Sequence, residues 1–73
     1  MSRAVAIGEA ARVAGYALAG VEVRPVESPV AALDAWRTLD GDTQLVLLTP
    51  AAADALDGLL TETAGRIWVV LPE

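Results

Sequence analysis

The side chains that could carry out chemistry in this chain are carboxylates, hydroxyls and arginines, because its 73 residues include no histidine, cysteine or lysine. A histidine general base, a thiolate nucleophile, a Schiff-base lysine and the phosphate-binding lysine of a P-loop are therefore excluded. An enzyme site assembled between copies of the chain is one hypothesis. It would use Glu9, Thr49 and Arg66, which fall near expected strand ends. Because none of these groups is expected to titrate near neutral pH, we rank an enzyme as the weakest hypothesis.

The remaining polar residues have structural interpretations that we prefer. Asp40 and Asp42 flank a glycine and could attract a cation, but this pattern is more typical of a solvated turn. Ser28 and Thr49 each precede a proline, so we predict that they cap helices and are not nucleophiles. A phospho-receiver domain would need an aspartate at the place of Thr49 and a lysine after a later strand. We therefore predict no catalytic residue, no metal site and no cofactor.

The elements that would position these residues alternate between strands and helices. Strands are expected at residues 3–7, 21–26, 44–48 and 66–71, with helices from about 9 to 20, from Ser28 to Leu39 and from Thr49 onward. Such alternation predicts a single α/β domain over residues 1–73 with a parallel sheet. The second strand carries Pro25 and alternating charges, which suits a sheet edge.

The glycines of the first strand and helix have an unusual arrangement. Gly15 falls inside the helix, where glycine costs about 1 kcal/mol relative to alanine unless a close backbone contact compensates. Gly20 suits a left-handed C-terminal cap. With Gly8, these positions do not fit the dinucleotide-binding spacing Gly-x-Gly-x-x-Gly, so we expect the glycines to serve close packing.

This stretch resembles the N-terminal signature of the V-type (archaeal and vacuolar) ATP synthase F subunits, a strand ending in Ile-Gly followed by a helix with Gly-aromatic-x-Leu-Ala-Gly. The matching residues are Ile7, Gly8, Val13, Gly15, Tyr16, Leu18, Ala19, Gly20 and Val21. The resemblance implies a small three-layer, flavodoxin-like domain with strand order 2-1-3-4.

The resemblance also implies a function. The F subunits are non-catalytic components of the central rotor stalk, where they bind the long coiled-coil subunit and assist the coupling of ATP turnover to proton or sodium transport. The family's chain usually continues into a C-terminal helical segment, which this sequence lacks, so contact with the catalytic subunits is not carried over. The alternative is a divergent homo-oligomeric interaction domain with no ATPase role.

Right-handed crossovers place the first helix on one face of such a sheet and the other two on the opposite face. The fourth strand should then leave either Trp68 and Val70 or Ile67, Val69 and Leu71 incompletely covered. We therefore predict a partner interface over Ile67, Trp68, Val69, Val70 and Leu71, which another subunit or a second copy covers. Trp36 is expected in the core, whereas Trp68 suits core and interface equally.

Composition limits the other partners and the location. Hydrophobic residues make up 55% of the chain, which suits a packed core, and the net charge of −5 makes nucleic acids and anionic membrane surfaces poor partners. No apolar run approaches the roughly 20 residues of a membrane-spanning helix. We expect a cytoplasmic protein, or one that is peripheral to the membrane through the ATPase complex, with no direct membrane insertion.

Overall fold

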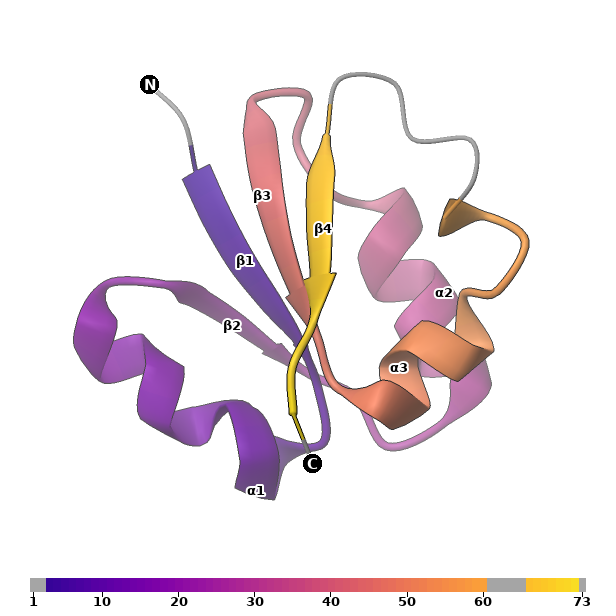
Figure 1. The fold of residues 1–73 in the computed structure, drawn as a ribbon, viewed down its shortest axis with the longest axis horizontal. Helices are drawn as coiled ribbons and strands as arrows, with labels where there is room; N and C mark the ends of the chain where they lie inside the picture. The colour runs from indigo at the N-terminus through magenta and orange to yellow at the C-terminus, as the bar shows by residue number, and fades with distance from the viewer. Residues whose placement is uncertain (1–2, 61–65, 73) are drawn as a thin grey trace.

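A four-stranded parallel sheet forms the centre of the computed structural model, which describes residues 3–60 and 66–72 (Figure 1). The strands are β1 (Arg3–Gly8), β2 (Glu22–Pro25), β3 (Thr43–Leu48) and β4 (Ile67–Val70). They lie in the order β2-β1-β3-β4, and all three neighbouring pairs are parallel. The α/β class, the strand order and the edge position of the second strand are confirmed.

Helices cover the two faces of the sheet unequally. The helix α1 (Ala10–Val13) and the 3₁₀ helix η1 (Ala14–Ala19) lie on one face, and α2 (Pro29–Arg37) and α3 (Pro50–Ala55) lie on the other, as Figure 1 shows. The first pair packs mainly on β1 and β2. The predicted three-layer arrangement, with one helical segment against two, is therefore confirmed.

The start signals of α2 and α3 work as the sequence predicts. The Ser28 Oγ accepts a hydrogen bond from the Ala31 N–H at 3.1 Å, and the Thr49 Oγ1 accepts one from the Ala52 N–H at 3.3 Å. A proline follows each cap at the start of the helix, where no intrahelical donor is needed. The boundaries elsewhere differ from the predicted ones, most of all at α3, which ends at Ala55 so that Leu59 and Leu60 lie beyond it.

The first helix differs from its prediction. A single α-helix through Gly15 was expected, but the α-helical hydrogen bonds stop after one turn and the chain continues as a 3₁₀ helix. A Cβ on Gly15 would meet no atom within 4 Å, so the expected close backbone contact there is wrong. Glycine propagates an α-helix poorly, which contributes to the change of helix type. Gly20 has φ 84° and caps the segment, as predicted.

The main core lies between the sheet and the pair α2–α3. The β1 residues Val5 and Ile7 pair in register with Val46 and Leu48 of β3, and all four side chains are fully buried. Trp36 of α2 packs in the same cluster, which confirms its expected core position. Ala6 and Val13 are buried on the α1 side.

Candidate functional site

The first candidate site is the outer edge of β4. This strand pairs with β3, and the Leu71 N–H extends the ladder by donating to the Leu48 carbonyl at 2.7 Å. Within residues 3–60 and 66–72, no strand pairs with its other edge. Natural edge strands are commonly protected by a charge, a proline or a bulge, and β4 (Ile67–Val70) has none of these. The edge can therefore accept another strand.

The register of β4 decides which of its side chains face which layer. Residues paired in a parallel sheet point to the same side, so Trp68 and Val70 share the α2–α3 side with Val46 and Leu48. Ile67 and Val69 lie on the α1 side beside Leu45 and Leu47.

The α1 side of β3 and β4 is the less covered of the two faces. Ile67 is 66% exposed and Val69 is 45% exposed, while Leu45 and Leu47 are half-buried. In Figure 1, α1 and η1 lie beside β2, and no described helix covers this side of β3 and β4. Of the two sets predicted to be uncovered, the set with Ile67 and Val69 is the more exposed. We call Leu45, Leu47, Ile67 and Val69 the open face.

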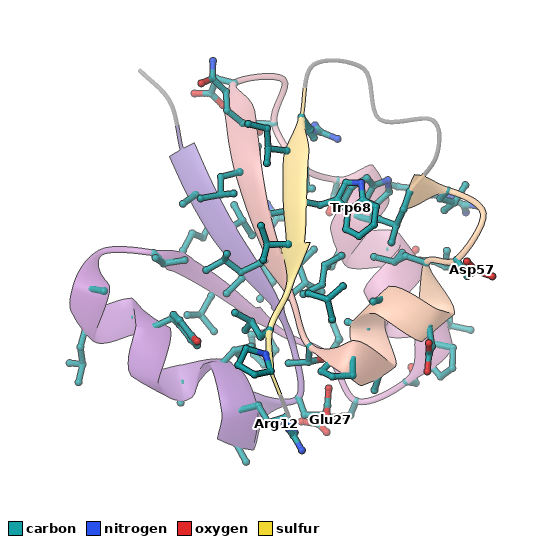
Figure 2. The ribbon with its side chains drawn as sticks, viewed as in Figure 1. Arg12, Glu27, Asp57 and Trp68 are labelled. Atoms are coloured by element: carbon teal, nitrogen blue, oxygen red, sulfur yellow. The ribbon has the colours of Figure 1, made fainter. Side chains whose placement is uncertain are left out.

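The other face of β4 is partly covered. The Trp68 side chain is 37% exposed, and its Nε1–H donates to the Leu60 carbonyl at 3.2 Å (Figure 2). Val70 on this face is 41% exposed, whereas Leu71, which alternation places on the side of Ile67 and Val69, is half-buried. Trp68 thus fastens β4 to the segment after α3 and still presents part of its ring to solvent, which agrees with its equal suitability for core and interface.

The residues of the glycine-rich motif lie away from β4. Gly8 ends β1 beside Thr49, and a Cβ at Gly8 would overlap the Thr49 side chain, so close packing is confirmed there. Tyr16 is half-buried on η1, whereas Ala19 and Gly20 are exposed and Leu18 is 94% exposed. The structure therefore does not gather the motif and the predicted interface into one site.

A second candidate site is a pocket of about 140 Å³ beyond the carboxyl ends of β1 and β2. Its walls are mostly apolar and come from the loop after β2 and from residues of α2 and α3. The lining residues are Glu9, Val26, Glu27, Ser28, Pro29, Ala32, Ala51, Ala52 and Ala55. Open parallel sheets commonly bind ligands at this end of their strands.

Glu9 lines this pocket beside the start of α3. Its Oε1 accepts a hydrogen bond from the Thr49 Oγ1 at 2.6 Å, and its Oε2 lies 3.5 Å from the Arg12 Nε. The Thr49 hydrogen bond and, to a smaller extent, the Arg12 charge lower the pKa of Glu9 below its ordinary value of 4.5. The carboxylate of Glu9 is therefore ionised at neutral pH.

Glu27 is a functional candidate that the sequence reasoning missed. Its Oε1 accepts a hydrogen bond from the Ala10 N–H at 3.2 Å, so Glu27 caps α1. Glu9 occupies the N-cap position of α1 but makes no side-chain cap hydrogen bond. A glutamate just before the Ser28 cap has no distinctive local pattern. Its position could have been inferred from the topology: Glu27 follows β2 and Ala10 follows β1, and the carboxyl ends of these neighbouring parallel strands lie at the same edge of the sheet.

Arg66 does not join Glu9 and Thr49. Its guanidinium lies at the opposite end of the sheet, where Nε donates to the Thr43 carbonyl at 3.2 Å and Nη2 donates to the Asp40 carbonyl at 3.0 Å. Its Cζ also lies 5.7 Å from the centroid of the Trp36 ring. Within one chain, the three residues of the enzyme hypothesis are thus divided between the two ends. Across the described residues, no group of three or more acidic side chains is arranged to hold a metal ion.

The pocket is poorly suited to phosphate. Helix starts bind anions through free backbone N–H groups, but donors at the three helix starts here already have acceptors in Glu27, Ser28 and Thr49. The first residues of α2 and α3 are prolines, which have no N–H. Two carboxylates at the same site add repulsion. The geometry disfavours nucleotides and other anions, and it favours cations.

Searches against protein-family models, curated proteins and solved structures find no match. In the part of the chain that the structure describes, no helix is long and apolar enough to cross a membrane.

Proposed function

We propose that this protein is a non-catalytic interaction subunit that binds a partner through β4 and the open face. The observation that carries this proposal is the exposure of Ile67 and Val69 on a strand without charged residues. An apolar sheet surface of this kind commonly marks a protein–protein contact. Val70 and the exposed part of Trp68 continue the apolar surface around the edge of β4.

The occupant that best fits the open face is an amphipathic helix of another protein. Parallel sheets are normally covered by helices on both faces, and here α1 and η1 pack mainly on β1 and β2. A partner helix lying beside α1 would complete that layer. Its apolar residues at positions i, i+3, i+4 and i+7 would pack on the four residues of the open face.

The resemblance of Ile7–Val21 to the F subunits suggests which helix this is. We propose the coiled-coil subunit of a V-type ATPase or ATP synthase central stalk, with this chain assisting the coupling of ATP turnover to proton or sodium transport. The support consists of the motif residues, the strand order that the family implies, and an uncovered surface suited to a helix. The role is one of binding and needs no catalytic residue.

The test is affinity purification of the tagged protein from its native cells, followed by mass spectrometry. The wild type should retain the coiled-coil stalk subunit together with catalytic ATPase subunits, and Ile67→Glu should lose them because it places a charge in the open face. Val30→Glu is the matched control, since Val30 is 69% exposed on α2 and lies outside the interface. Circular dichroism must show that both variants fold.

Two outcomes would contradict the proposal. One is a wild-type sample that retains no stalk subunit. The other is an Ile67→Glu sample that retains the same subunits as Val30→Glu, because the contact would then lie elsewhere.

The uncharged edge of β4 favours a second candidate, self-association by strand pairing. Two copies related by a twofold axis would extend their sheets edge to edge and leave the open face uncovered. Light scattering on the purified protein separates the two candidates. A stable dimer that persists in Ile67→Glu would favour edge pairing, and a monomer that binds only the stalk subunit would favour the helix.

A further inference from the structure

We infer that the pocket between Glu9 and Glu27 binds a primary alkylammonium group, supplied by a lysine side chain of another protein. This site is separate from β4 and the open face, so the inference does not depend on the proposed function. Because the chain contains no lysine, a lysine side chain in this pocket must come from another molecule.

The walls of the pocket suit the hydrocarbon part of such a side chain. Apart from the two glutamates and the Ser28 hydroxyl, which already serves as a helix cap, the lining consists of a valine, a proline and four alanines. Val26, Ala32 and Ala52 are buried there. Lysine packs its methylene stem along apolar surface while its charged end remains at a polar site. The pocket therefore offers a surface for the stem.

The charge at the pocket suits the ammonium end. Both glutamates contribute to the lining, and Glu9 already forms an ion pair with Arg12. Among the described residues, the Glu27 carboxylate accepts a hydrogen bond from the backbone N–H of Ala10 and forms no ion pair. A carboxylate has about four acceptor sites, so Glu27 has capacity for an ammonium donor. The net charge of −5 also favours the approach of a cation.

The size of the pocket restricts the ligand. A volume of about 140 Å³ is well below the roughly 300–1,000 Å³ of sites for drug-sized molecules, so a nucleotide or a large metabolite is not accommodated. A single unbranched side chain is the appropriate scale. Lysine carries a compact charge on a flexible unbranched stem, which fits this scale.

The test is a titration of ¹⁵N-labelled protein with Nα-acetyl-lysine-N-methylamide, followed by amide chemical shifts. Saturable shifts are expected at Ala10, Glu27, Ser28 and Ala52, with a dissociation constant in the millimolar range. The norleucine analogue, which has a similar stem without the charge, should bind measurably less, and inorganic phosphate should cause no saturable shift at these amides.

Glu27→Gln isolates the charge, because the amide oxygen can still accept from the Ala10 N–H. We expect it to weaken binding about two- to fivefold, the range for one exposed charge pair. Asp57→Asn removes the same charge outside the pocket, beyond the end of α3 in Figure 2, and should leave the affinity unchanged. Both variants should keep the wild-type circular dichroism spectrum.

The inference is overturned if no saturable shift occurs at these amides, if norleucine binds as well as lysine, or if Asp57→Asn weakens binding as much as Glu27→Gln. Titration with 1,5-diaminopentane distinguishes the source of the ammonium group. Markedly tighter binding of this diamine would assign the pocket to a free amine and overturn the assignment to a protein lysine.

Discussion

Among the glycines that the structure describes, Gly8 should be the most costly to replace with alanine. An ideal Cβ at Gly8 would lie 2.5 Å from Thr49 Oγ1 and 2.9 Å from Thr49 Cβ, closer than real Cβ contacts. Thr49 is only 1% exposed, so its side chain has little room to move. Alanine at position 8 therefore forces Thr49 or the end of β1 to shift.

The size of the effect follows from what Thr49 holds in place. Forcing a methyl group into a filled interior costs about 1–3 kcal/mol. Displacing Thr49 also weakens the cap of α3, at about 1 kcal/mol, and disturbs its hydrogen bond to Glu9. We expect Gly8→Ala to lower the free energy of unfolding by about 2–4 kcal/mol, against a total stability of about 4–11 kcal/mol for 73 residues.

Urea unfolding followed by circular dichroism measures this loss. Gly41→Ala is the matched control, because a Cβ there meets nothing within 4 Å and no positive φ is involved; it should change stability by less than about 0.5 kcal/mol. The double variant Gly8→Ala with Thr49→Ala should lose less than the sum of the two single variants, since removing the Thr49 side-chain atoms relieves the overlap. Equal losses for Gly8→Ala and Gly41→Ala, or strict additivity in the double variant, would refute the reasoning.

Three further predictions concern the first helix, the Glu9 carboxylate and β4. Gly20→Ala should lower the free energy of unfolding in urea by about 1 kcal/mol, because φ at this position is 84° and disfavours a residue with a Cβ. Gly15→Ala should raise it by up to about 1 kcal/mol, because alanine favours a helix and its Cβ would meet no other atom within 4 Å. The pKa of Glu9 is lower in the folded than in the unfolded protein, so its ionised carboxylate stabilises the fold above pH 4.5. This stabilisation is lost as the pH falls through the folded-state pKa. Glu9→Gln should therefore make the urea midpoint depend less on pH in the acidic range. Trp68→Phe should lower the free energy of unfolding by about 1 kcal/mol, because it removes the hydrogen bond to the Leu60 carbonyl. An unchanged urea midpoint would argue against that bond.

The parts of the fold that follow from local signals could be predicted from the sequence. Ser28-Pro29 and Thr49-Pro50 each combine a cap with a residue that suits only the first turn of a helix, and both helices begin there. The alternation of strands and helices indicated a parallel sheet, while the strand order came from the family resemblance. Right-handed crossovers then placed the helices on the correct faces.

Features that depend on nonlocal packing could not be predicted. The change from α-helix to 3₁₀ helix near Gly15 reflects a balance between weak helix propensity and contact with β2, which spacing alone does not resolve. The same limit applies to Glu27, whose hydrogen bond to Ala10 joins residues 17 positions apart. The sequence predicted an uncovered β4, but only the register identified Ile67 and Val69 as its more exposed pair.

The location of the buried core sets β4 apart from the other strands. Every member of the main buried cluster lies between Val5 and Leu60, and β4 contributes none. The strands β2, β1 and β3 with α2 and α3 therefore hold the described members of that cluster, and β4 is the strand that can separate at the least cost to the core. Amide protons of β4 should exchange with solvent sooner than those of β1 and β3. A partner that binds β4 would hold this strand in the sheet and slow the exchange of its amide protons. Slower exchange in β4 would therefore measure binding of the partner.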